Sequence, residues 1–173
     1  MASQPDLPNV VRQLYQGGAY RPTVVSIIRY LLAGNDHLLF VRPSRGTELS
    51  FPQGGIELEP KLDDANPEKA LARELEEELV IDLSQLKIVR FLGYEAVRIK
   101  QSRGARLRGF GFGKQYFAYE CTYTGDPKAI RPRDLQEVAA VYWIPRSDSK
   151  EALTTQTNVV KAEALCQFVD MLR

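Results

Sequence analysis

The chain has 173 residues, of which 44% are apolar and 26% charged, and its 23 Lys and Arg against 22 Asp and Glu give a net charge of +1. These values lie near the average of globular proteins and exclude a disordered, collagen-like or disulfide-stapled chain. The near-neutral charge also excludes a protein whose whole surface binds nucleic acid, so any anion-binding site must be local.

Neither a disulfide framework nor a membrane segment is indicated. Cys121 and Cys166 lie far apart and form no CxxC motif, so we expect two reduced thiols in a cytoplasmic protein. The first twenty residues lack the apolar run of a signal peptide. The longest apolar stretch, residues 23–34, is interrupted by Arg29 and is too short to span a bilayer.

The predicted elements begin after an N-terminal arm. Prolines and glycines punctuate residues 1–22, which predicts a loosely ordered arm before a single domain over residues 23–173. Two β-branched, apolar segments on either side of Gly34-Asn35-Asp36 predict a hairpin. A long loop over residues 43–66 follows, and it leads into a helix from Pro67 to about Leu79.

The second half of the chain is rich in strands. Residues 88–99 and 114–123 are two strand candidates joined by a basic, glycine-rich connector, and residues 138–144 are a third. Apolar residues at helical spacing predict a closing helix over about residues 158–172. Strands outnumber helices, and the helices occur singly among them. The predicted fold class is therefore α/β (α+β), an α/β/α sandwich on a mixed central sheet.

The helix predicted after Pro67 carries an unusual acidic face. Asn66 suits the N-cap and Pro67 the first helical position. At about 100° per residue, the side chains of Glu74, Glu77 and Glu78 share one face, next to a leucine stripe that can dock on a sheet. Glu76 points the opposite way, into solvent.

Carboxylates crowded in this way repel one another unless cations neutralise them. Mg²⁺ prefers carboxylate oxygens and shares its coordination with substrate phosphates. Arg73 can hold Glu77 at i,i+4, and the upstream Gly54-Gly55 allows a close approach of the backbone. A solvated, charged helix face is the alternative interpretation. The one-sided geometry favours a metal site.

This segment resembles the signature of the Nudix hydrolases, which is Gly, five residues, Glu, seven residues, then Arg-Glu-apolar-x-Glu-Glu-x-Gly-apolar. Residues 73–81 match its second half except at Val80, which replaces the glycine that ends the helix. The spacing from Gly55 to Arg73 is four residues longer than the signature allows, and Ala65 stands where the first glutamate is expected. We therefore expect a longer loop in an active enzyme.

Three further segments resemble the RNA pyrophosphohydrolases and related dinucleoside polyphosphate hydrolases of this family. They are the Tyr-Arg-Pro-Thr-Val of residues 20–24, the Phe-Pro-Gln-Gly-Gly of residues 51–55, and Glu137 six residues before Trp143. In that subgroup a late glutamate binds metal or acts as the base. The resemblance covers the chain from residue 20 to about residue 145.

The resemblance implies a Nudix-type sandwich and hydrolysis by water attack on phosphorus, dependent on Mg²⁺ or its substitute Mn²⁺. The implied metal ligands are the carbonyl of Gly54 and the carboxylates of Glu74, Glu77, Glu78 and Glu137. Arg73 would act in catalysis by orienting Glu77. The base stays open among Glu77, Glu78 and Glu137, with Glu137 favoured.

The expected substrate contacts are basic or lie in the glycine-rich loop, and they are Arg21, Arg42, Gln53, Gly55 and Lys114, with Arg45 a further phosphate-binding candidate. The connector over residues 98–114 carries six cations and no acid, and its phenylalanines could stack on a base. A solvated hairpin tip is the alternative for this connector.

The expected substrate is a nucleoside polyphosphate, either a dinucleoside polyphosphate such as diadenosine tetraphosphate or a 5′-triphosphorylated RNA end. ADP-ribose or another nucleotide sugar and a free nucleoside triphosphate are the alternatives among enzymes. A nucleotide-sensing Nudix module without activity is the rival from another class. We expect no membrane partner and a monomer or homodimer.

Overall fold

The computed structural model describes residues 6–59, 62–63, 65–100, 106, 109–154 and 158–173. Its helices are α1 (Leu7–Gly17), α2 (Pro67–Glu78), α4 (Ser149–Thr154) and α5 (Val159–Asp170), with 3₁₀ turns at Leu83–Gln85, Pro127–Ala129 and Arg146–Asp148. Its strands are β1 (Tyr20–Leu32), β2 (Asn35–Pro43), β3 (Gln53–Gly55), β4 (Leu58–Glu59), β5 (Leu62–Asp63), β6 (Leu79–Val80), β7 (Leu86–Arg98), β8 (Gly113–Tyr123), β9 (Arg131–Pro132) and β10 (Val138–Pro145).

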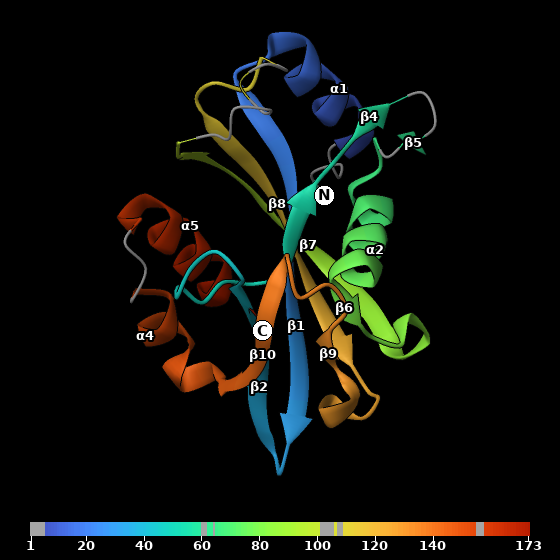
Figure 1. The fold of residues 1–173 in the computed structure, drawn as a ribbon, viewed down its shortest axis with the longest axis vertical. Helices are drawn as coiled ribbons and strands as arrows, with labels where there is room; N and C mark the ends of the chain where they lie inside the picture. The colour runs from blue at the N-terminus through green and yellow to red at the C-terminus, as the bar shows by residue number, and fades with distance from the viewer. Residues whose placement is uncertain (1–5, 60–61, 64, 101–105, 107–108, 155–157) are drawn as a thin grey trace.

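A mixed sheet forms the middle layer. Its strand order is β10-β2-β1-β8-β7, and β3 pairs with the first half of β1. Strands β1 and β8 run parallel, whereas the other pairs of this sheet are antiparallel. Helices α1 and α2 lie over one face and α4 and α5 over the other (Figure 1). The predicted α/β/α sandwich with a mixed sheet is confirmed.

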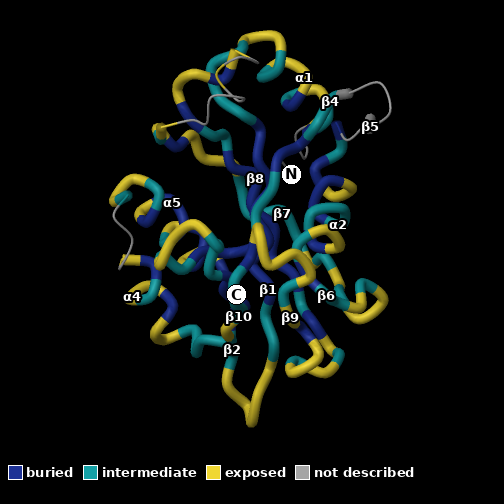
Figure 2. Tube along the Cα trace, in the orientation of Figure 1, coloured by how far each residue is buried: buried dark blue, intermediate teal, exposed yellow. Residues whose placement is uncertain are grey.

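Two apolar cores hold the layers together. Side chains of β1 alternate between them, so that Val24 and Ile28 pack beneath α2 whereas Val25 and Ile27 pack beneath α5. The buried residues run along the centre of the sheet in Figure 2, and the hairpin tip is exposed. No helix among the described residues is long and apolar enough to cross a membrane.

The predicted hairpin is present, but its turn lies earlier than expected. Leu32 pairs with Asn35, so Ala33 and Gly34 are the two loop residues. Both have positive φ, 48° and 81°, as a two-residue turn that follows the twist of the strands requires. Asn35 and Asp36 already belong to β2.

The prediction of a loosely ordered arm is wrong for residues 7–17, which form α1. Asp6 caps the helix by accepting the N–H of Asn9, and Gly18 ends it in the left-handed conformation with φ 67°. Pro8 falls in the first turn, where a missing N–H costs nothing. The prolines and glycines that suggested a loop therefore mark the two ends of a helix.

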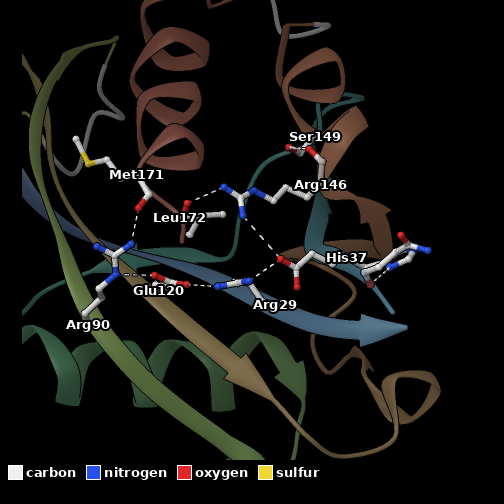
Figure 3. Close-up of polar contacts among 10 residues, drawn as sticks. Arg29, His37, Arg90, Glu120, Arg146, Ser149, Met171 and Leu172 are labelled. Carbon is white, nitrogen blue, oxygen red and sulfur yellow. Dashed lines mark hydrogen bonds and ion pairs between the residues drawn. The ribbon is translucent and has the colours of Figure 1, made fainter. Parts of the chain in front are cut away.

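A buried carboxylate joins three strands beneath α5. Glu120 on β8 is only 1% exposed, and its two oxygens accept from Arg29 on β1 and from Arg90 on β7, the latter at 2.7 Å (Figure 3). Arg29 also binds Asp36 on β2. Glu120 and Asp36 thus neutralise two arginines that the sheet register brings to the same place.

The same arginine network fixes the end of the chain. Arg90 donates to the carbonyl of Met171, and Arg146 donates to that of Leu172 at 2.6 Å. Figure 3 shows both arginines reaching the end of α5 from different segments. These two hydrogen bonds therefore hold the end of α5 against the sheet.

We expect Glu120→Gln to lower the free energy of unfolding by about 2–4 kcal/mol, because Arg29 and Arg90 would lose their shared anion in a partly buried place. Urea denaturation measures the loss. Glu95→Gln, an exposed position on β7, is the matched control and should change it by less than about 0.5 kcal/mol. Equal stability of the two variants would contradict the assigned role of Glu120.

Candidate active site

A cavity of about 630 Å³ opens where α2, β3 and the turn before β10 meet. Most of the site residues predicted from the sequence line it, although they come from distant segments. Its lining consists of Arg21, Gln53, Gly54, Gly55, Glu74, Glu77, Glu78, Lys114, Asp134 and Glu137.

Helix α2 presents its acidic face to this cavity as predicted. Asn66 caps the helix by accepting the N–H of Glu68 at 2.9 Å. Leu71 and Leu75 are each 1% exposed, so the leucine stripe is buried under the sheet. Because that stripe fixes the rotation of the helix, its glutamates at 74, 77 and 78 face the cavity while Glu76 is exposed.

The two glycines of β3 leave room for side chains of two other elements. A Cβ at Gly54 would lie 1.8 Å from Cδ of Glu74, and a Cβ at Gly55 would lie 2.1 Å from Nη2 of Arg21. A side chain at either position would displace the carboxylate of Glu74 or the guanidinium of Arg21. The glycine pair therefore lets one acidic and one basic side chain lie directly against the backbone of the loop.

Arg73 ties α2 to this loop. It donates to the carbonyl of Gly55 at 2.7 Å and pairs with Glu77 at 2.9 Å, the contact predicted from the i,i+4 spacing. It also pairs with Glu74 at 2.9 Å, which the spacing did not indicate. Arg73 does not line the cavity, so its contacts make it a residue that orients others.

The end of α2 explains how the chain manages without the glycine replaced by Val80. Instead of a left-handed residue, Leu79 is extended and begins β6, which pairs with β9. The carbonyl of Glu78 accepts the N–H of Arg133 at 2.8 Å. This pairing brings the segment after β9 against the acidic end of the helix.

That segment carries Asp134 and Glu137 into the cavity. The side chain of Asp134 accepts the N–H of Gln136, and its carbonyl accepts that of Glu137. The carbonyl of Glu137 in turn accepts the N–H of Ser44. Asp134 was missed from the sequence, although its place three residues before Glu137 in the same turn was a usable signal.

One wall of the cavity is acidic and is formed by Glu74, Glu77, Glu78, Asp134 and Glu137. Ionising all of these carboxylates together is unfavourable. Burial, together with the charges of Glu74 and Glu137, raises the pKa of Glu78 to about 8. Burial also raises the pKa of Glu74, although Arg73 opposes the rise. The protein alone thus disfavours full ionisation of this wall, and a bound cation would relieve the cost.

The opposite wall is cationic. Arg21 and Lys114 occupy neighbouring strands in register, and Nζ of Lys114 lies 3.4 Å from Oε1 of Gln53. Burial lowers the pKa of Lys114 to about 8, and the charges of Lys161 and Arg21 contribute. Lys161 was not predicted, because it follows every recognised motif along the chain.

The residues of the acidic wall fit a hard divalent cation. Carboxylate oxygens suit such an ion, and neutralisation would favour the charged form of Glu78. Among the described residues, however, no three acidic, histidine or cysteine side chains converge into a ready metal cluster. Arg73 pairs with both Glu74 and Glu77, so an ion that binds them would have to compete with this arginine. Glu77 is 58% exposed and has room to turn.

Two predicted phosphate contacts lie elsewhere. Arg42 on β2 does not line the cavity. Arg45 lines a separate cavity of about 300 Å³.

The basic connector over residues 98–114 is described only in part, and one of its phenylalanines is buried while another is exposed. Residues 101–105 and 107–108 lie outside the described part of the chain. Phe110 is 1% exposed and packs edge to face against Tyr15, so it cannot stack on a base as expected. Phe112 is 55% exposed, with the guanidinium of Arg98 5.8 Å above its ring.

The NUDIX domain family matches residues 21–167. Among solved structures, the binary complex of the C. elegans Ap4A hydrolase has a TM-score of 0.62 at 16% identity and covers 87% of this chain and 93% of its own. The NUDIX domain of Shewanella oneidensis NrtR complexed with ADP ribose has a TM-score of 0.60 at 16% identity, covering 88% and 86%. The E. coli dihydroneopterin triphosphate pyrophosphohydrolase has a TM-score of 0.58 at 17% identity, and the match covers 89% of this chain and 99% of its own. No curated protein is significantly similar to the chain in sequence.

At such low identities these structural likenesses show the fold alone. The family follows from the domain match, which spans most of the chain and includes the cavity with its acidic helix. The chain belongs to the Nudix family of hydrolases and is a pyrophosphohydrolase.

Proposed function

We propose that the protein is a Mg²⁺-dependent hydrolase of a nucleoside polyphosphate, with Mn²⁺ as a possible substitute ion. The preferred substrate is a dinucleoside polyphosphate such as diadenosine tetraphosphate or a 5′-triphosphorylated RNA end. The observation that carries this proposal is that one cavity has an acidic wall on α2 and a cationic wall on β1 and β8. A phosphate chain with bound divalent ions is complementary to both walls.

The acidic wall would hold the ions through Glu74, Glu77 and Glu78, with the carbonyl of Gly54 beside them. A bound ion would act as a Lewis acid on the phosphate and lower the pKa of a coordinated water. Arg73 keeps Glu77 and Glu74 on the cavity side of the helix.

The cationic wall would hold the phosphates. The guanidinium of Arg21 can bind phosphate oxygens through two N–H groups at once, whereas Lys114 offers a point charge. Gln53 lies within reach of Lys114, and the missing side chain of Gly55 leaves space for Arg21.

Glu137 is our choice for the base that takes the proton of the attacking water. Its backbone is fixed on both sides by hydrogen bonds, it lines the cavity, and it takes no part in the ion pairs of Arg73. Glu77 is a poorer choice because Arg73 already neutralises it.

A cytoplasmic location and a monomeric or homodimeric state stay predictions. Both cysteines are free, with Cys121 buried, which agrees with a reducing compartment.

We expect Glu77→Gln and Glu137→Gln each to lower turnover by at least about 100-fold, because one removes a metal ligand and the other the base. The measurement is a mass-resolved product assay with Mg²⁺ on diadenosine tetraphosphate, 5′-triphosphorylated RNA and ADP-ribose offered together. Glu76→Gln, on the exposed face of α2, is the control and should keep full turnover.

Preferential loss of either of the first two substrates supports the proposal. Consumption of ADP-ribose alone would contradict the polyphosphate assignment and leave the metal site standing. Turnover that persists in Glu77→Gln would contradict the assigned site.

We expect Gly54→Ala to weaken Mn²⁺ binding and turnover by about tenfold or more, because the new Cβ must displace the Glu74 carboxylate. Gly46→Ala is a matched control, since a Cβ there meets nothing within 4 Å. Electron paramagnetic resonance of Mn²⁺ gives the affinities. Unchanged binding in Gly54→Ala would show that Glu74 is not a ligand.

The raised pKa of Glu78 predicts a pH dependence of stability in the metal-free protein. Since the folded pKa of about 8 exceeds the ordinary value of 4.5, ionisation of Glu78 costs stability as the pH rises between these values. In EDTA at pH 8, Glu78→Gln should therefore be more stable than the wild type by roughly 1–3 kcal/mol, after allowance for solvent screening. Urea denaturation at several pH values tests this, and the difference should fade towards pH 4.5. A variant less stable than the wild type at pH 8 would contradict it.

A further inference from the structure

We propose that Glu57, held by Tyr15 of α1, positions Arg21 for binding substrate phosphate. This inference rests on the proposed function and deepens it, because it identifies what aims the phosphate-binding group. No motif in the sequence indicated Glu57 or Tyr15, and both lie outside the acidic face of α2.

The contacts form a short chain from the helix to the cavity. Nη2 of Arg21 donates to Oε1 of Glu57 at 2.7 Å, with the two side chains 25% and 17% exposed. The hydroxyl of Tyr15 donates to the carbonyl of Ile56 and lies 3.4 Å from the other oxygen of Glu57. Helix α1 therefore holds the backbone next to Glu57, whose carboxylate pairs with Arg21.

Glu57 leaves most of the guanidinium available. It engages one N–H group of Arg21, and Nε of Arg21 is buried without a hydrogen-bond partner. A buried donor without an acceptor is unfavourable, so a further acceptor is expected in the functional state. Since Arg21 lines the cavity beside Lys114, a phosphate there can accept from the guanidinium N–H groups that reach the cavity, and from Nε once the side chain turns towards it.

Arg21 needs an anionic partner away from α2 because the cavity is rich in carboxylates. An unbraced guanidinium would pair with Glu74, whose charge it already influences, and would compete with a metal ion for that ligand. Glu57 gives Arg21 an anionic partner outside α2. Gly55 makes the arrangement possible, since a Cβ there would lie 2.8 Å from Oε1 of Glu57 as well as against Arg21.

The test is a set of double-mutant cycles with Glu57→Gln, Tyr15→Phe and Arg21→Ala. We would measure kcat and KM for diadenosine tetraphosphate, and the Kd of the non-hydrolysable α,β-methylene-ADP with Mg²⁺ by calorimetry. Glu76→Gln on the exposed face of α2 is the matched control. Circular dichroism checks the fold of each variant.

Glu57→Gln should raise KM and Kd about tenfold with kcat within about threefold, and Tyr15→Phe should raise them about threefold. In the Arg21→Ala background neither substitution should have a further effect, since both act through that arginine.

The inference is overturned if Glu57→Gln behaves like Glu76→Gln, if it tightens binding, or if its effect multiplies with that of Arg21→Ala. Should Glu57→Gln fail to fold, the Tyr15→Phe cycle decides by the same criteria. A wild type that cleaves no offered nucleotide but binds α,β-methylene-ADP would contradict the proposed function. The double-mutant cycle in Kd would still test whether Glu57 positions Arg21. No binding of α,β-methylene-ADP by the wild type would overturn the brace itself.

Discussion

The contact between α2 and the glycine pair of β3 is the constraint on which the site depends. Glu74 lies where a side chain of Gly54 would be, and Arg73 donates to the carbonyl of Gly55. The buried leucine stripe sets the rotation of the helix, and this contact sets its distance from the sheet. Every other feature of the cavity follows, because the acidic face then meets the edge of the sheet where β1 and β8 bring their basic residues.

Opposite charges share this part of the molecule. Arg73 donates to the carbonyl of Gly55 and pairs with Glu74 and Glu77, whereas Arg21 pairs with Glu57 outside α2. Burial, together with the charges of Glu74 and Glu137, raises the pKa of Glu78, so the carboxylates at the end of α2 are costly to ionise in the free protein. A divalent ion would neutralise the acidic wall, and its bound phosphates would neutralise the cationic wall. The charges that are unfavourable in the free protein are therefore those that a metal-bound phosphate chain would pair with.

The sequence predicted the acidic face of α2 from local periodicity. The cavity residues Arg21, Gln53, Gly55 and Glu137 were expected from the resemblance, and Lys114 as a cation of the basic connector. The face of α2, its N-cap and the Arg73–Glu77 pair depend on spacing along one helix, which is readable without a fold. The Arg21–Glu57 pair depends on how distant segments meet, and no local pattern carries that information. Helix α1 was missed because its terminal proline and glycines look like loop residues. Phe110 was misjudged for the same reason, since α1 buries it through Tyr15.

The most direct test of the account is a crystal structure with Mn²⁺ and α,β-methylene-ADP, in which anomalous scattering locates the metal. The account predicts Mn²⁺ between the carboxylates of Glu74, Glu77 and Glu78, with the phosphates extending towards Arg21 and Lys114. Metal bound away from α2, or phosphates that contact neither basic residue, would contradict the proposal that the two walls act together on one substrate.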